Sequence, residues 1–156
     1  MSQKVLIAFD DSENAMRAVE YAARLLTKDC RITLFSVVQD TASICDLHSP
    51  ELTPYFKSQQ DSFCALEEKK RQLISAAALK AREILTANGF REDQIQLKSE
   101  TKKKGIARDI VVEAQSGYDL VVLGRRGLAG IREFFMGSVS QKVLSLAQDL
   151  PVLIVN

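Results

Sequence analysis

The sequence predicts an α/β fold: one doubly wound sheet of five parallel strands with helices on both faces. Five strand-like segments alternate with four segments whose apolar residues recur at helical spacing. Parallel strands need long, right-handed crossovers that are usually helical, so this alternation favours a doubly wound sheet. At 156 residues the chain fits a single domain, residues 1–156, that can bury a sizeable core.

The first part of the chain predicts a strand, a helix and a second strand. The run from Val5 to Phe9 is continuously apolar, which is typical of a strand covered on both faces. Asp10 follows, and Asp11 or Ser12 can cap the next helix. The apolar residues of that helix recur at helical spacing: Ala15, Ala18, Val19, Ala22, Leu25 and Leu26. Residues 31–38 form the second strand.

A long connection and a long helix come next. Residues 39–58 are polar, contain two prolines and show no clean period, so we expect a long, mobile connection. The segment from Gln59 to Asn88 has a helical pattern and ends at an Asn-Gly helix stop. Its expected apolar face comprises Phe63, Leu66, Leu73, Ile74, Ala77, Ala81, Ile84 and Leu85.

The last part of the chain completes the alternation. Residues 94–101 alternate between apolar or small and polar side chains, as expected for an exposed edge strand. A helix follows Gly105, and the next strand runs from Tyr118 to Leu123. A helix over Ser138 to Gln148 and a strand over Pro151 to Val155 end the chain; a proline at the first residue of a strand costs no ladder donor.

Composition and cysteine content narrow the function classes. The chain has 21 Lys plus Arg and 20 Asp plus Glu, so no overall field recruits nucleic acid or a membrane. No signal peptide or membrane-spanning stretch is evident. The three cysteines, Cys30, Cys45 and Cys64, form no CxxC pair, so we expect a reduced, cytoplasmic setting. Cys45 and His48 form a poor nucleophile–base pair, because no orienting partner is evident.

Glycines near the carboxyl end carry the clearest functional pattern. The strand-like run ends in Gly124; Gly127 follows, and Gly137-Ser138 opens a helix. Glycine lets a backbone turn or approach a ligand closely, and a helix amino terminus presents free N–H groups to an anion. The chain has neither a Walker A sequence nor GxGxxG. The spacing therefore predicts a phosphate site of another kind, while ordinary turn and cap roles are the alternative.

The chain resembles the universal stress protein family in its ATP-binding subclass. Gly124, Gly127, Gly137 and Ser138 match the family's nucleotide signature, and Ser140 matches the serine or threonine often found just beyond. The resemblance extends to Val-x4-Asp-x-Ser over residues 5–12 and to the closing Pro-Val-Leu-Ile-Val. It implies a Rossmann-like fold of the adenine nucleotide alpha hydrolase type with strand order 3-2-1-4-5.

This strand order predicts the binding cleft. The winding direction changes between strands 1 and 4, and open α/β sheets bind ligands at such a crevice. The resemblance implies ATP or AMP, with Mg2+ or Mn2+ on its phosphates. The expected nucleotide-binding residues are Ala8, Phe9, Asp10, Val38, Leu123, Gly124, Gly127, Gly137, Ser138, Val139 and Ser140.

The expected roles follow from their chemistry. Backbone N–H groups from Gly127 and Gly137 onward, with the hydroxyls of Ser138 and Ser140, would contact phosphates. Asp10 would accept from a ribose hydroxyl or the adenine edge, or bond a water on the metal, because its charge repels phosphate. In the family, the main chain at the position of Val38 meets the adenine.

Two features depart from the family pattern. Arg125 and Arg126 stand between the first glycines, where they would add charge at the phosphates or, as we favour, lie in solvent. Phe9 is bulkier than the usual residue beside the aspartate and would narrow the pocket.

No residue set predicts strong catalysis. We therefore expect a nucleotide-binding regulator of stress adaptation, with at most weak ATP hydrolysis or autophosphorylation. One alternative is a nucleotide-free dimeric interaction module of the same fold. The other is an adenylating ATP pyrophosphatase-type enzyme, whose SGGxDS loop is replaced here by Phe9-Asp10-Asp11-Ser12.

The last strand also predicts an assembly. Val152, Leu153, Ile154 and Val155 would form an apolar sheet edge with unpaired N–H and C=O groups. The family resemblance implies that this strand pairs antiparallel with its symmetry mate. We therefore expect a homodimer through the last strand, with no nucleic-acid or membrane partner.

Overall fold

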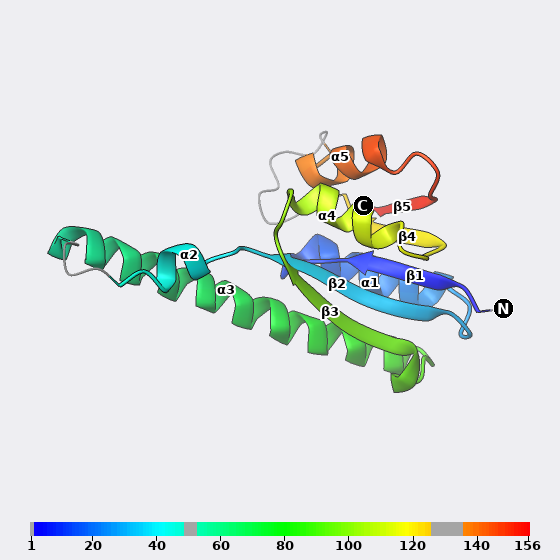
Figure 1. Ribbon diagram of the computed structural model, residues 1–156. Coiled ribbons are helices and arrows are strands. Elements are labelled where there is room, and N and C mark those ends of the chain that lie inside the picture. The colour runs from blue at the N-terminus through cyan, green and yellow to red at the C-terminus, as the bar shows by residue number, and fades with distance from the viewer. Residues whose placement is uncertain (1, 49–52, 126–135) are drawn as a thin grey trace.

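The structure is a computed structural model that describes residues 2–48, 53–125 and 136–156. Its centre is a five-stranded parallel sheet with the order β3-β2-β1-β4-β5 (Figure 1). This confirms the predicted fold class and the strand order that the family resemblance implied. The strands are β1 (Lys4–Ala8), β2 (Arg31–Val38), β3 (Ile95–Thr101), β4 (Leu120–Gly124) and β5 (Val152–Val155).

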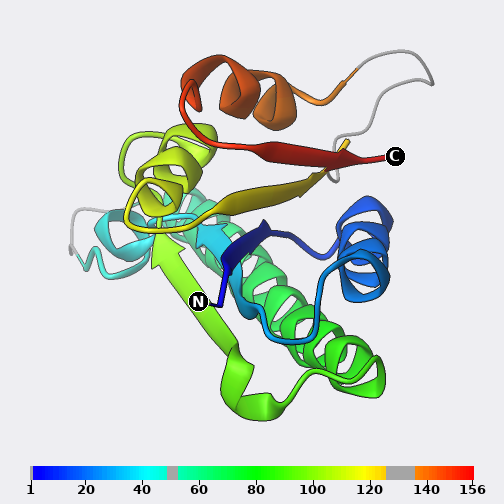
Figure 2. The ribbon, with the colours of Figure 1, turned by 90° about the vertical axis from the view of Figure 1, so that its right-hand side faces the viewer.

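Helices cover both faces of the sheet (Figure 2). One face packs against α1 and the carboxyl-terminal half of α3, and the other packs against α4 and α5. The helices of the described residues are α1 (Glu13–Leu25), α2 (Ala42–Cys45), α3 (Pro54–Ala87), α4 (Ile106–Ala114) and α5 (Ser138–Leu146), with a 3-10 turn, η1 (Glu92–Gln94).

The alternation of side chains explains why β1 reads as a continuous apolar run. Val5 and Ile7 lie in the core cluster with α1 and α3, whereas Leu6 and Ala8 lie in the cluster with α4 and α5. Successive side chains of a strand point to opposite faces, so a strand that is covered on both faces needs apolar residues throughout. At the edge, β3 has exposed residues, as predicted.

The long helix α3 begins at Pro54, within the predicted connection. Thr53 is its N-cap, and the Thr53 hydroxyl accepts a hydrogen bond from the Phe56 N–H at 3.2 Å. Proline suits the first helical turn, where no hydrogen-bond donor is lost. A further difference is α2, because residues 42–45 of the connection are helical.

Together, α2 and residues 54–70 of α3 form an arm that extends past the carboxyl end of β2 (Figure 1). Leu85 of α3 is fully buried against the sheet, but Leu66 in the arm is 53% exposed. The predicted apolar face of α3 is therefore a core face only in its carboxyl-terminal half.

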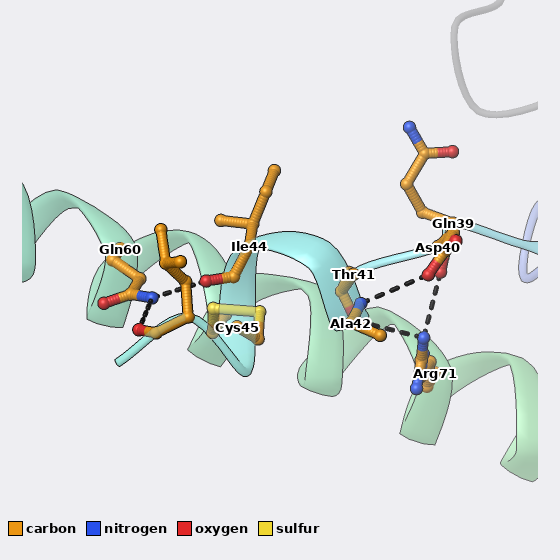
Figure 3. Close-up of a disulfide and its surroundings, with 10 residues drawn as sticks. Gln39, Asp40, Thr41, Ala42, Ile44, Cys45, Gln60 and Arg71 are labelled. Atoms are coloured by element: carbon orange, nitrogen blue, oxygen red, sulfur yellow. Dashed lines mark hydrogen bonds between the residues drawn. A yellow bond between two sulfur atoms is a disulfide. The ribbon is translucent and has the colours of Figure 1, made fainter. Parts of the chain in front are cut away.

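The cysteines contradict the expectation of three reduced thiols. Cys45 of α2 and Cys64 of α3 form a disulfide (Figure 3). Cys30 is a buried free thiol. The pairing arises because α2 lies along α3, which no spacing rule on the sequence reveals. It also removes Cys45 as a nucleophile. No helix among the described residues is both long and apolar enough to cross a membrane.

Candidate functional site

The carboxyl ends of β1 and β4 meet at the point where the sheet changes its direction of winding. These strands are neighbours, with Ile7 opposite Val122, although more than a hundred residues separate them in the sequence. Sites in open α/β sheets occur at such a point. We call the ends of β1 and β4, together with the first turn of α5, the β1–β4 junction.

On the β1 side, backbone hydrogen bonds position Phe9 and Asp10. The Phe9 N–H donates to the Phe35 carbonyl at 3.0 Å, which continues the strand pairing beyond β1. The Asp10 Oδ1 accepts from the Ser12 N–H at 2.9 Å, and the Ser12 Oγ caps α1 by accepting from the Ala15 N–H at 3.2 Å. One oxygen of Asp10 thus stabilises the turn that starts α1, whatever else the carboxylate binds.

On the β4 side, Gly124 allows a close approach of α1. A Cβ atom at this position would lie 2.8 Å from the carbonyl oxygen of Asn14 and 2.9 Å from its carbonyl carbon. Any side chain here must push β4 and the first turn of α1 apart. The structure therefore gives this glycine a packing role, which the sequence analysis did not consider beside its predicted ligand role.

The amino terminus of α5 is tied to the end of β4. The Gly137 N–H donates to the Arg125 carbonyl at 2.8 Å, and the buried Ser140 hydroxyl donates to the Gly124 carbonyl at 2.8 Å. These two groups were expected to donate to phosphate, but here they donate to main-chain carbonyls. The N–H groups of Ser138, Val139 and Ser140 lie in the first turn of α5, where the helix itself offers no acceptor.

Other predicted residues surround this junction. Ala8 and Leu123 are buried in the core cluster with α4 and α5, directly behind the strand ends. Arg125 is half-buried, and its N–H donates to the Val155 carbonyl at 2.7 Å. Gly127 and Arg126 lie outside the described residues.

The end of β2 differs in detail from the expectation for Val38. The Val38 carbonyl accepts from the Lys102 N–H at 2.7 Å and so faces β3, whereas the Phe35 carbonyl faces β1. Main-chain groups of successive strand residues alternate between the two neighbouring strands. It follows that the main chain of Val37 faces the side where β1 has already ended. The sequence does not reveal which residues of β2 bond to β1 and which bond to β3, so it could not show this difference.

A groove of about 550 Å³ lies between α3 and the carboxyl-terminal parts of β2 and β3. Phe9 and Val38 line it, so it adjoins the β1–β4 junction. Its lining combines apolar side chains with polar or charged ones, which are Ser36, Arg71, Ser75, Lys98, Ser99 and Thr101. Apolar walls with polar groups that orient a ligand are typical of small-molecule sites.

The loop after β3 is fixed at the same edge of the sheet by Asp109. The Asp109 carboxylate accepts from the N–H groups of Lys103 at 2.8 Å and Lys104 at 3.1 Å. Burial alone would raise the pKa of Asp109, but these backbone donors and the Gly105 N–H hold it below its ordinary value.

The described ranges contain no group of three or more His, Cys, Asp or Glu side chains that could hold a metal ion. Asp10 is the acidic side chain at the β1–β4 junction that could bond a water on a metal carried by a bound phosphate.

Two curated proteins are similar to this chain over nearly their whole length. A universal stress protein in the QAH/OAS sulfhydrylase 3'region of Thermus aquaticus is 28% identical, and each chain is fully covered. The universal stress protein Sll1388 of Synechocystis is 30% identical, with 93% of this chain and 92% of the relative covered.

Solved structures share the fold. A universal stress protein in complex with cAMP aligns with a TM-score of 0.62 and 22% identity, covering 99% of this chain and 97% of the other. The universal stress protein of Archaeoglobus fulgidus in complex with dAMP gives a TM-score of 0.58 and 18% identity, covering 100% and 98%. At such identities these likenesses show the fold alone. The model of the universal stress protein family matches residues 1–156, and the chain therefore belongs to the universal stress protein family.

Proposed function

We propose that this chain binds an adenine nucleotide, ATP or AMP, at the β1–β4 junction and acts as a regulator in stress adaptation. The observation that carries the proposal is the attachment of α5 to β4 by the Gly137–Arg125 and Ser140–Gly124 hydrogen bonds, each 2.8 Å long. These bonds direct the first-turn N–H groups of α5 toward the point where β1 and β4 end. A helix amino terminus with free N–H groups favours an anionic phosphate.

The remaining groups have roles that match the rest of a nucleotide. The N–H groups of Ser138, Val139 and Ser140 bind phosphate oxygens, and Gly127 adds a further donor. Asp10 accepts from the ribose or the base, or bonds a water on Mg2+ or Mn2+. The main chain of Val37 meets the adenine edge, and the groove lined by Phe9 and Val38 receives part of the base.

The related complexes support this choice of ligand. The two solved relatives hold cAMP and dAMP, and both ligands contain adenine and a phosphate. Adenine and a single phosphate are thus the elements that the two ligands share. In the proposed role the chain is a binder, and hydrolysis or autophosphorylation is slow at most.

Calorimetric titration of the full chain tests the proposal. Mg-ATP and AMP should bind, whereas GTP, which differs only in the base, should bind at least tenfold more weakly, about 1.4 kcal/mol. Acid extraction of the freshly purified protein, followed by nucleotide chromatography, should release ATP or AMP. An empty extract, together with no heat and no thermal shift on adding either adenine nucleotide, would favour the nucleotide-free module.

We also propose that the chain forms a homodimer through β5. Val152, Leu153 and Ile154 are half-buried, and β5 is the last strand in the sheet order. A second copy pairing with its outer edge would satisfy the open N–H and C=O groups. Deletion of residues 153–156 should give monomer or aggregate in light scattering, and an unchanged dimer would exclude this interface.

A cytoplasmic location also remains a proposal. The three cysteines form no CxxC pair, which predicts a cytoplasmic setting, but the Cys45–Cys64 disulfide means that the cysteines no longer support it. Cytosolic disulfides are usually transient, catalytic or redox-sensing. Fractionation of the source cells decides the location directly.

A further inference from the structure

The arm contains a pair of cysteines that the nucleotide site does not use. The disulfide between Cys45 and Cys64 joins α2 to α3 across 19 residues, with the Cα atoms 5.9 Å apart (Figure 3). Both residues are half-buried. In contrast, Cys30 is completely buried, so small thiols and disulfides can reach the pair but not the third cysteine.

Polar contacts also hold residues 39–48 to α3. Gln60 Nε2 donates to the carbonyls of Ile44 and Leu47, and it lies 3.0 Å from the latter. Arg71 Nη2 donates to the Gln39 carbonyl at 2.9 Å and to the Thr41 hydroxyl at 3.1 Å. These contacts and the disulfide are visible together in Figure 3.

Apolar packing contributes little to this attachment. The side chains of Ile44 and Leu47 are 42% and 44% exposed, and none of the residues of α2 is buried. A four-residue helix has almost no stability of its own. The covalent bond is therefore the main constraint that keeps residues 42–48 folded on α3.

The same segment is joined to the groove beside the β1–β4 junction. Arg71 and Val38 line the groove, and Arg71 is held by Gln39 and Thr41. The disulfide lies farther along the same segment, so loss of the bond loosens the attachment that positions Arg71 at the groove.

We propose that Cys45 and Cys64 form a reversible dithiol–disulfide site that fixes residues 39–48 on α3 when oxidised and releases them when reduced. The oxidant is a small disulfide such as glutathione disulfide. One protein thiol loses its proton to water, and the thiolate attacks the small disulfide, forming a mixed disulfide and expelling one glutathione thiolate. The second protein thiolate then attacks the protein sulfur of the mixed disulfide and expels the other glutathione.

The exchange reaction conserves the number of disulfide bonds and thiols. One disulfide bond breaks in glutathione disulfide and one forms between Cys45 and Cys64. Two protein thiols are oxidised, two glutathione thiols are produced, and excess glutathione reverses both steps. This site does not depend on nucleotide binding, so its test is separate from that of the proposed function.

The first measurement counts thiols in the full chain. Alkylation under denaturing conditions, followed by mass spectrometry, should find one reactive thiol after glutathione disulfide and three after excess glutathione, with the change at Cys45 and Cys64 only. The number of reactive thiols should return to its starting value when the protein is transferred back to the first buffer. A pair that stays oxidised or stays reduced at every ratio would overturn the proposal.

The second measurement follows hydrogen exchange in residues 42–48. The N–H groups of Ile44, Cys45 and Asp46 donate to the carbonyls of Thr41 and Ala42 within α2. Reduction should speed their exchange by about tenfold to a hundredfold, because loss of the cross-link favours local opening. Peptides from β1 should show no change.

Cysteine variants provide the matched control. The double variant Cys45→Ser/Cys64→Ser should exchange at the reduced rate in both buffers, whereas Cys30→Ala should keep the redox response of the wild type. The same exchange rate in oxidised and reduced wild-type protein would show that the disulfide does not hold the segment.

Discussion

The β1–β4 junction and the arm both leave the carboxyl edge of one sheet, but different forces hold them in place. At the junction, main-chain bonds such as the 2.7 Å bond from the Arg125 N–H to the Val155 carbonyl join the elements, and the buried Ser140 hydroxyl adds a side-chain bond to the Gly124 carbonyl. The strands behind it are buried on both faces. In the arm, the attachment is provided by the Gln60 side chain, by one disulfide and, just beyond the arm, by the Arg71 side chain.

The two regions therefore change their structure under different conditions. The junction rests on strands that are buried on both faces, so opening it must expose part of the core. In the described residues of the arm no apolar side chain is buried, and in the proposed switch reduction releases residues 39–48 from α3. The junction is rigid enough to hold ligand-binding groups in place, whereas the arm can change its conformation with the redox state.

The largest expected effect is on ligand binding at the junction. Gly137 has φ −61° and ψ 153°, an ordinary N-cap conformation, and aspartate is a favoured N-cap residue. Gly137→Asp should therefore fold normally but weaken Mg-ATP binding at least a hundredfold, about 2.7 kcal/mol, because its charge repels phosphate. Calorimetric titration measures the loss, and circular dichroism checks the fold.

Gly137→Asn is the matched control for that variant. It has the same size and capping ability without the charge, so it should bind more tightly than Gly137→Asp. A folded Gly137→Asp protein with wild-type affinity would show that phosphate does not bind here.

The two halves of α3 should respond differently to the same truncation. Leu85→Ala removes a fully buried side chain and should lower the free energy of unfolding by about 2–5 kcal/mol. Leu66→Ala in the arm, where the side chain is 53% exposed, should cost less than about 0.5 kcal/mol. Urea denaturation of both variants makes the comparison. Equal losses would mean that the arm has a core of its own.

Gly124→Ala should destabilise the junction by steric conflict. Its new Cβ would lie 2.8 Å from the Asn14 carbonyl oxygen, so α1 and β4 must move apart at a cost of about 1–3 kcal/mol. Thermal unfolding measures this loss. The companion variant Gly117→Ala meets no atom within 4 Å but forces a positive φ, so it reports backbone strain without overlap. An unchanged Tm for Gly124→Ala would contradict the close packing of α1.

The smallest effect is a pH dependence at the loop after β3. Backbone donors lower the pKa of Asp109 in the folded protein. The stabilisation that its carboxylate gives is therefore present above the pKa of the unfolded state, about 3.9. Asp109→Asn should therefore cost about 1–2 kcal/mol at pH 7. The difference from wild type should shrink as the pH falls below about 4, because the unfolded carboxylate takes up a proton there and the folded one does so only at its lowered pKa. Chemical denaturation at several pH values tests this, and a difference that grows in acid would refute it.

Several features were predictable because they depend on local or periodic signals. The five strands, a cap at Asp11 or Ser12 and an edge strand over residues 94–101 follow from apolar pattern and short-range chemistry, and the structure places the cap at Ser12. The convergence of residues 10 and 124 followed once the family resemblance supplied the strand order. These signals are local, or they repeat along the chain, so the sequence alone is enough to detect them.

Other features depended on packing between distant segments. The start of α3 was placed too late because residues 54–58 carry no apolar period, although Thr53 and Pro54 form a good helix start. The face of Val38 depended on the parity of β2 pairing with β3, and the role of Gly124 depended on the approach of α1.

The sequence by itself determined the layered α/β fold, because burial on both faces of a sheet demands continuous apolar strands between amphipathic helices. Only the tertiary structure decided which groups meet. The Cys45–Cys64 disulfide exists because α2 folds back along α3, and the Ser140 hydroxyl meets the Gly124 carbonyl because α5 starts where β4 ends. Such contacts depend on distances in space, and residue types and spacing in the chain do not encode those distances directly.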